Sequence, residues 1–114
     1  MLSRGAASNP GRLRLRLALE KASAAPDGAG GSTLEWNAVA TIAAEVTPLR
    51  ADERGVGEGI GDMTRYRIFI RHREDVAAGD RFRLGERTFR IASVTDPAED
   101  GRYLACLADE EGRP

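Results

Sequence analysis

Residues that carry chemistry are scarce in this sequence. Its 114 residues include one histidine, His72, one cysteine, Cys106, and one lysine, Lys21, and aromatic residues make up only 5%. A metal site would need His72 together with carboxylates, but no converging pattern of acidic residues surrounds it. A Ser/His/Asp or Cys/His set has no candidate orienting group either. The sequence therefore predicts a protein that is not an enzyme and that has no metal and no cofactor.

Long apolar runs are missing as well. The longest apolar-biased stretch, residues 36–46, is interrupted by Asn37, Thr41 and Glu45 and is far shorter than the ~20 residues of a membrane-spanning helix. The N-terminus has no apolar segment of the kind found in secretory signals. We expect no membrane segment and synthesis in the cytoplasm. Cys106 lies in an alternating apolar run, so we expect it to pack as a small buried hydrophobe.

Arginine, by contrast, is abundant. Of 17 basic residues, 16 are arginine, and 18 acidic residues bring the formal net charge to -1. A chain of this length has room for one domain with one core. Arginine makes planar, bidentate pairs with carboxylates and suits subunit interfaces better than lysine does.

Alternation of apolar and polar residues predicts strands. In residues 12–20, four leucines on one parity alternate with Arg12, Arg14 and Arg16 on the other, which is typical of a strand with one buried face. Further strands are expected at residues 36–49, 64–73, 81–84, 87–94 and 102–108. Residues 36–49 also permit a helix as a weaker option. Residues 23–32, rich in Ala, Pro and Gly, are predicted to form a flexible hairpin-like connection.

These elements predict an all-β fold, a small barrel or sandwich of about six strands. A long Gly-rich loop is expected between the second and third strands. We place a flexible arm at residues 1–11, the barrel domain at 12–108 and a solvated, charged C-terminal tail at 109–114. Trp36 and Phe89 are candidates for the core, with an interface role as the alternative.

The strand expected at residues 64–73 has an arginine-rich face. Its outward parity contains Phe69 and four arginines, namely Arg65, Arg67, Arg71 and Arg73. Such a face suits either nucleic acid or the acidic residues of a neighbouring copy. The near-zero net charge and the few aromatics favour a subunit interface. A small nucleic-acid-binding barrel of the OB type remains the alternative.

The order of these parts resembles the head closure, or stopper, proteins of the phage head-tail joining family. The resemblance covers residues 12–108, and the ordered set carries it because no single motif is specific. Two features depart from the family pattern: the Gly-rich loop after Leu49, and the pair His72-Arg73. The arginine-rich, compact chain also suits a gene transfer agent particle. The matching residues are Leu13, Trp36, Glu45, Val46, Pro48, Leu49, Ile70, Arg71, Gly79, Arg81, Phe89, Ile91, Val94 and Asp96.

The resemblance implies a structural subunit in the neck of a virion or phage-like particle, assembled in the bacterial cytoplasm. About twelve copies would form a closed ring, which would seal the DNA exit channel after packaging and dock the tail. The implied partners are other copies of the chain, a portal-bound adaptor protein, and a tail terminator or tail tube protein. Double-stranded DNA would pass through the channel without sequence recognition.

Residues 50–63 are the predicted gate of that channel. Glycines at every second position, from Gly55 to Gly61, predict a mobile loop in the free chain. In a ring, such loops would point toward a common axis, where Val56 and Ile60 pair edge to edge and the carboxylates face anionic DNA. The alternative is a surface loop without a role. The gate residues are Arg50, Asp52, Glu53, Val56, Gly57, Glu58, Gly59, Ile60 and Asp62.

Overall fold

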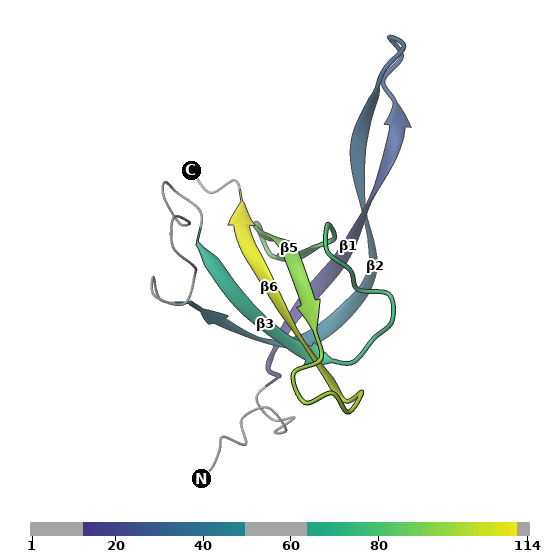
Figure 1. Cartoon of the computed structure of the whole chain (residues 1–114). Helices are drawn as coiled ribbons and strands as arrows, with labels where there is room; N and C mark the ends of the chain where they lie inside the picture. The colour runs from purple at the N-terminus through teal and green to yellow at the C-terminus, as the bar shows by residue number, and fades with distance from the viewer. Residues whose placement is uncertain (1–12, 50–63, 112–114) are drawn as a thin grey trace, which may run out of the picture.

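The computed structural model describes residues 13–49 and 64–111. These residues form six β-strands and no helix (Figure 1). The all-β fold predicted from the alternation is confirmed. No helix that could cross a membrane occurs in this part of the chain. The strands are β1 (Leu15–Pro26), β2 (Ser32–Pro48), β3 (Arg65–Arg71), β4 (Arg81–Leu84), β5 (Arg87–Thr95) and β6 (Tyr103–Glu111).

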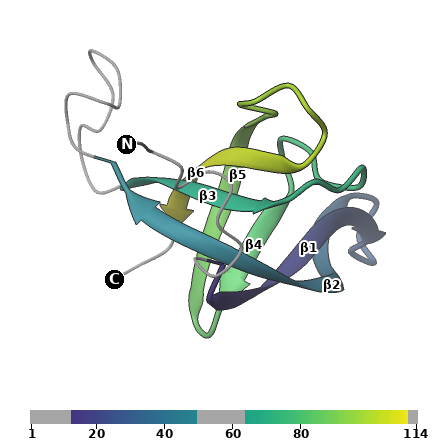
Figure 2. The same cartoon turned by 90° about the horizontal axis from the view of Figure 1, so that it is seen from below.

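The six strands form one antiparallel sheet that closes on itself. Their order is β1-β2-β3-β6-β5-β4, and β4 pairs back onto β1, so the sheet is a closed barrel (Figure 2). The β4–β1 contact is short, because only Ala18, Leu19 and Glu20 of β1 have partners in β4. Closure leaves the barrel itself with no long unpaired edge.

The core fills the inside of the barrel with residues of the inward parity. Leu17 and Leu19 are fully buried, as the alternation predicts, while Leu15 at the strand's start is 40% exposed. Cys106 is buried, and burial raises the pKa of its thiol to about 12. Its expected packing as a small hydrophobe is confirmed. The largest fully buried side chains are those of Phe82, Phe89, Leu17, Leu19, Ile68, Ile70, Ile91 and Cys106.

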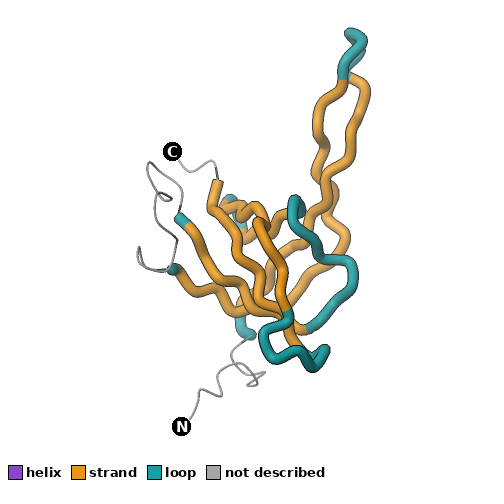
Figure 3. The backbone as a smooth tube through the Cα atoms, in the orientation of Figure 1, coloured by secondary structure: helices purple, strands orange, loops and turns teal. Residues whose placement is uncertain are grey.

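A two-stranded ribbon projects from the barrel where a flexible connection was expected (Figures 1 and 3). The β1–β2 register continues without a break from Lys21↔Asn37 to Pro26↔Ser32, so the predicted hairpin-like connection is a hairpin, but residues 23–26 and Ser32 belong to its strands and not to the connection. Only residues 27–31 form the turn, in which the Asp27 carboxylate accepts hydrogen bonds from the amides of Ala29 (2.8 Å) and Gly31 (3.0 Å). We call residues 21–26 and 32–38 the ribbon. It makes the molecule 58 Å long against 31 and 25 Å across.

Two other boundaries differ from the predictions. β6 continues through Glu111, so Asp109, Glu110 and Glu111 belong to the sheet and not to a solvated tail. β3 ends at Arg71, which leaves His72 and Arg73 in the connection to β4. That connection closes one end of the barrel with the buried side chain of Val76.

The same connection is tied to the sheet by hydrogen bonds. The amide of Gly79 donates to the carbonyl of Ile91 (2.9 Å), and the amide of Ile91 donates to the carbonyl of Asp80 (2.8 Å). The Lys21 ammonium pairs with the Asp80 carboxylate at 2.6 Å. This ion pair fastens the root of the ribbon to the closed end of the barrel.

Candidate assembly surfaces

The four arginines predicted for the subunit interface have different surroundings. Arg65 donates two hydrogen bonds to Asp109, at 2.8 and 3.0 Å, across the β3–β6 pair. Arg73 makes a similar pair with Asp75, at 2.9 Å for both contacts, in the connection after β3. These hydrogen bonds hold the pKa of Asp75 below its ordinary value and raise that of Arg73. Arg67 and Arg71 are exposed on the outside of β3.

Arg67 and Arg71 lie on a larger cationic face with an apolar floor. Arg16 of β1 pairs in register with Ala43 of β2, and Arg71 pairs with Tyr103 of β6. Between these rows Phe69 is only 7% exposed, and its ring stacks on that of Tyr103 with centroids 5.0 Å apart. One carboxylate lies within this surface, because Glu45 of β2 pairs in register with Phe69. We call this surface the cationic face and define it by Arg16, Arg67, Arg71, Ala43, Glu45, Phe69, Tyr103 and Leu107.

The three arginines of the cationic face are free to meet a partner. Arg16, Arg67 and Arg71 are all exposed. Within residues 13–49 and 64–111 none of them has an ion pair or a side-chain hydrogen bond. An exposed guanidinium loses little hydration when it pairs with a carboxylate at the edge of an interface.

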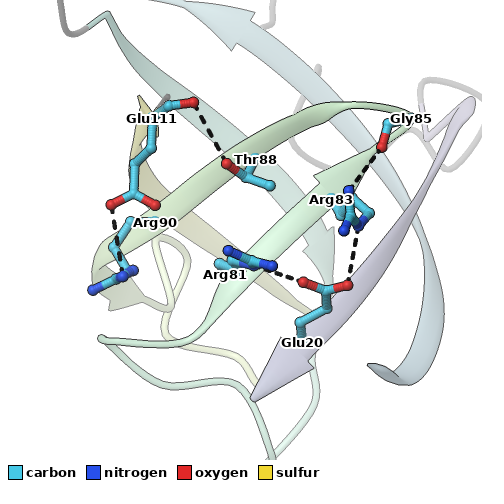
Figure 4. A network of polar contacts seen from close by, with 7 residues as sticks. All are labelled: Glu20, Arg81, Arg83, Gly85, Thr88, Arg90 and Glu111. Carbon is cyan, nitrogen blue, oxygen red and sulfur yellow. Dashed lines mark hydrogen bonds and ion pairs between the residues drawn. The ribbon is translucent and has the colours of Figure 1, made fainter. Parts of the chain in front are cut away.

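A second arginine cluster covers the outside of β4 and β5 (Figure 4). Glu20 accepts hydrogen bonds from Arg81 (2.6 Å) and Arg83 (3.2 Å), and Arg90 lies 3.7 Å from the Glu111 carboxylate. The guanidinium carbons of Arg81 and Arg90 are 4.3 and 4.8 Å from the centroid of the Trp36 ring. Trp36 therefore lies outside the core, at the root of the ribbon, and holds the ribbon against β4 and β5.

The loss of stability at acid pH should reveal the contribution of the ion pairs that Glu20 makes with Arg81 and Arg83. Burial raises the pKa of Glu20, but the hydrogen bonds and charges of Arg81 and Arg83 outweigh it and bring the pKa below its ordinary 4.5. The stabilisation is present above that ordinary value and is lost as the pH falls through the lowered one. Between pH ~7 and ~3 we expect wild type to lose more free energy of unfolding than Glu20→Gln, measured by urea denaturation. Identical losses in the two proteins would show that Glu20 does not contribute in this way.

A third polar group lies at the barrel end from which residues 50–63 depart. Arg87 donates to Glu110 at 2.8 and 3.2 Å and to the Tyr66 hydroxyl at 3.2 Å. Burial, with the nearby Glu110 carboxylate, raises the pKa of Tyr66 above its ordinary value, so the phenol stays neutral. The amide of Leu49 donates to the carbonyl of Arg65, and that of Glu110 to the carbonyl of Thr64, both at 2.9 Å. Both flanks of the segment are thus hydrogen-bonded to neighbouring strands.

The predicted gate residues themselves lie outside the described residues. This applies to Arg50, Asp52, Glu53, Val56, Gly57, Glu58, Gly59, Ile60 and Asp62. The gate stays a prediction from the sequence.

Elsewhere the described residues offer surfaces for binding. His72 is exposed in the connection after β3. Across residues 13–49 and 64–111 no three His, Cys, Asp or Glu side chains are grouped so as to hold a metal ion. What the arrangement provides is two arginine-bearing outer faces and a projecting ribbon. Sequence reasoning missed the ribbon and the β4–β5 cluster, although Leu34 and Trp36 alternate with polar residues in the segment.

Comparisons with known proteins give a family and two related structures. The chain matches the model of the phage head completion protein family over residues 8–111. It is similar to a protein in the solved virion of a native gene transfer agent particle, with 38% identity, a TM-score of 0.65, and coverage of 85% of this chain and 93% of that one. It also resembles the solution structure of protein SF1141 from Shigella flexneri 2a (28% identity, TM-score 0.69, coverage 93% and 99%). A search of curated proteins found no match.

Proposed function

The chain belongs to the phage head completion protein family, and we propose that it forms the head closure, or stopper, ring in the neck of a phage-like particle. In that position it would keep packaged DNA in the head and present the docking surface for the tail. Its partners would be other copies of itself, a portal-bound adaptor protein on the head side, and a tail terminator or tail tube protein on the other. The role is structural and needs no substrate.

The observation that carries this proposal is the likeness to the gene transfer agent protein, at 38% identity over 93% of that protein's length. A similarity that covers 85% of this chain extends over the whole barrel and is not limited to one motif. The surfaces are consistent with it, because a ring subunit needs two different faces that meet around a closed circle. The cationic face and the β4–β5 cluster are two such outer surfaces.

Light scattering coupled to size exclusion tests the ring. We expect the pure chain to be monomeric at micromolar concentration, since a barrel of this size folds alone and has no template for closure. With the adaptor-bearing portal complex present, the chain should elute in a large species of defined stoichiometry. A chain that never joins that complex would contradict the proposal.

The predicted gate has a test of its own. We expect a deletion of residues 55–61 to leave the circular dichroism spectrum of the barrel unchanged, because both flanks of the segment are hydrogen-bonded to neighbouring strands. Particles carrying the deletion should leak DNA or fail to add tails, measured by nuclease-protected DNA and electron microscopy. The matched control replaces the same seven positions with a Gly-Ser linker. Full transfer by the deletion variant would end the gate hypothesis and leave the family unaffected.

A further inference from the structure

The ribbon leaves the barrel at a β-bulge. The β1–β2 register shifts between Leu19 and Glu20, and Val39 of β2 is left without a partner in β1. Beyond this point the two strands pair only with each other, because β4 pairs with residues 18–20 of β1 and β3 with residues 44–48 of β2. A bulge bends its strand and increases the local twist. The bulge is therefore the point about which the ribbon would swing relative to the barrel.

Just beyond the bulge, Trp36 joins one face of the ribbon to two arginines of the barrel. The guanidinium carbons of Arg81 and Arg90 lie 4.3 and 4.8 Å from the centroid of its ring. The two arginines pair with each other across β4 and β5, and like charges in such a pair repel. The negative face of an indole ring attracts both of them.

The two guanidinium groups are themselves fixed to the barrel. Arg81 donates to the Glu20 carboxylate at 2.6 Å, and Arg90 lies 3.7 Å from the Glu111 carboxylate (Figure 4). The Nε of Arg90 is buried and has no hydrogen-bond partner within the described residues. The Trp36 ring therefore contacts groups that are held in place and that have few other partners.

Lys21 joins the opposite face of the ribbon to the barrel. Residues paired across two antiparallel strands point to the same side, and successive residues point to opposite sides. The pair Lys21↔Asn37 is next to the pair Ala22↔Trp36, so the Lys21 and Trp36 side chains lie on opposite faces. Lys21 pairs with the Asp80 carboxylate at 2.6 Å, and the backbone of Asp80 is hydrogen-bonded to β5. The root of the ribbon is thus held from both sides.

We propose that Trp36 and Lys21 form a two-sided latch that sets the direction in which the ribbon projects, with the bulge at Val39 as its hinge. A swing away from the outside of β4 and β5 separates Trp36 from both arginines. A swing in the other sense separates Lys21 from Asp80. Partly exposed polar contacts of this kind contribute little to the stability of the barrel, so their main effect is on the position of the ribbon.

The latch belongs to the free chain and does not depend on the proposed ring. If the ring forms, its rotational symmetry gives the ribbon of every copy the same direction. A ribbon that is already held in this direction loses less conformational freedom in any contact that it makes.

Double electron–electron resonance on the free chain tests the latch. One nitroxide is attached at Leu34→Cys on the ribbon, where the native side chain is 60% exposed. The other is attached at Ala92→Cys, an exposed position on β5 two residues beyond Arg90. The native Cys106 is buried and its thiol has a pKa of about 12, so it is not labelled at neutral pH.

The labelled chain without further changes should give one narrow distance distribution. Trp36→Ala should broaden it and add longer distances, because it frees the ribbon from the side that carries the second label. Lys21→Met should also broaden it. Trp36→Phe should keep it narrow, because a smaller aromatic face still attracts the guanidinium groups.

Arg83→Gln is the matched control. Arg83 belongs to the same cluster and donates to Glu20 at 3.2 Å, but within the described residues only Arg81 and Arg90 lie over the Trp36 ring. This variant should give the same narrow distribution as the unchanged chain.

Three results would contradict the latch. A broad distribution in the labelled chain without further changes would show that nothing holds the ribbon. A narrow distribution in Trp36→Ala or in Lys21→Met would show that the corresponding side does not hold it. If Trp36→Ala loses its β-sheet circular dichroism spectrum, Arg90→Gln tests the same contact with the indole retained, and an unchanged distribution in that variant would also overturn the inference.

Discussion

Replacing Phe89 with alanine should lower the free energy of unfolding by about 3–5 kcal/mol, as expected for a large ring removed from a packed core. Phe89 is 0% exposed and pairs with Phe82 across β4 and β5. Its ring makes an edge contact with Tyr66 at 5.2 Å and lies 4.9 Å from the Arg87 guanidinium. The substitution would remove core packing and the support of the Arg87–Glu110–Tyr66 group together. Urea denaturation followed by circular dichroism measures the loss.

Phe69→Ala is the matched control for that result. Phe69 is also buried, but on the outside of the sheet, where its ring stacks on that of Tyr103. We expect this variant to lose about 1–3 kcal/mol, less than Phe89→Ala, because it leaves no cavity inside the barrel. If Phe69→Ala cost as much as Phe89→Ala, the placement of the core inside the closed sheet would be wrong.

Arg71→Glu should reduce incorporation into particles at least about tenfold, the equivalent of ~1.4 kcal/mol for each contact, while stability changes by less than about 0.5 kcal/mol. Arg71 is exposed and unpaired within the described residues, so its reversal breaks nothing inside the subunit. It would place a negative charge on the exposed arginine face of β3, which is the predicted subunit interface. Quantitative immunoblots of purified particles, with urea denaturation of the free chain, measure both effects.

Arg65→Glu on the same strand should behave differently. It removes the bidentate pair with Asp109 and sets two carboxylates against each other, so we expect measurable destabilisation of the free chain. Arg65 and Arg71 have equivalent positions in the alternating sequence. A difference in stability between the two variants therefore tests the Arg65–Asp109 pair of the structure. An Arg71→Glu chain that enters particles normally would exclude Arg71 from any interface.

Periodicity was sufficient to predict the barrel strands and most of the core. Leu17, Leu19, Ile68 and Ile70 occupy the parity that alternation assigned to the inside, and all are fully buried. The ribbon escaped prediction because its alanines, Pro26 and neighbouring glycines have the composition of a loop. Its strands form because Leu34 and Trp36 oppose Ala24 and Ala22 in a register continued from the barrel, and composition does not reveal that register.

The candidate surfaces were predictable in kind but not in detail. The alternation of residues along β3 was sufficient to predict its arginine-rich face. Which of these arginines lack an ion-pair partner could not be predicted, because the partners are distant in sequence. Asp109 lies 44 positions from Arg65, and Glu20 lies 61 from Arg81. The β3–β6 pairing brings the first pair together and the closing β1–β4 contact the second. Arg67 and Arg71 have no such partners among the described residues.

Electron microscopy of particles from cells that lack this chain tests the central claim most directly. If the chain forms the head closure ring, the lysate should contain heads without tails beside complete free tails, and nuclease-protected DNA should be reduced. Expression of the wild-type chain from a plasmid should restore tailed particles. Tailed, transfer-competent particles at the normal yield in the absence of the chain would contradict the proposed function.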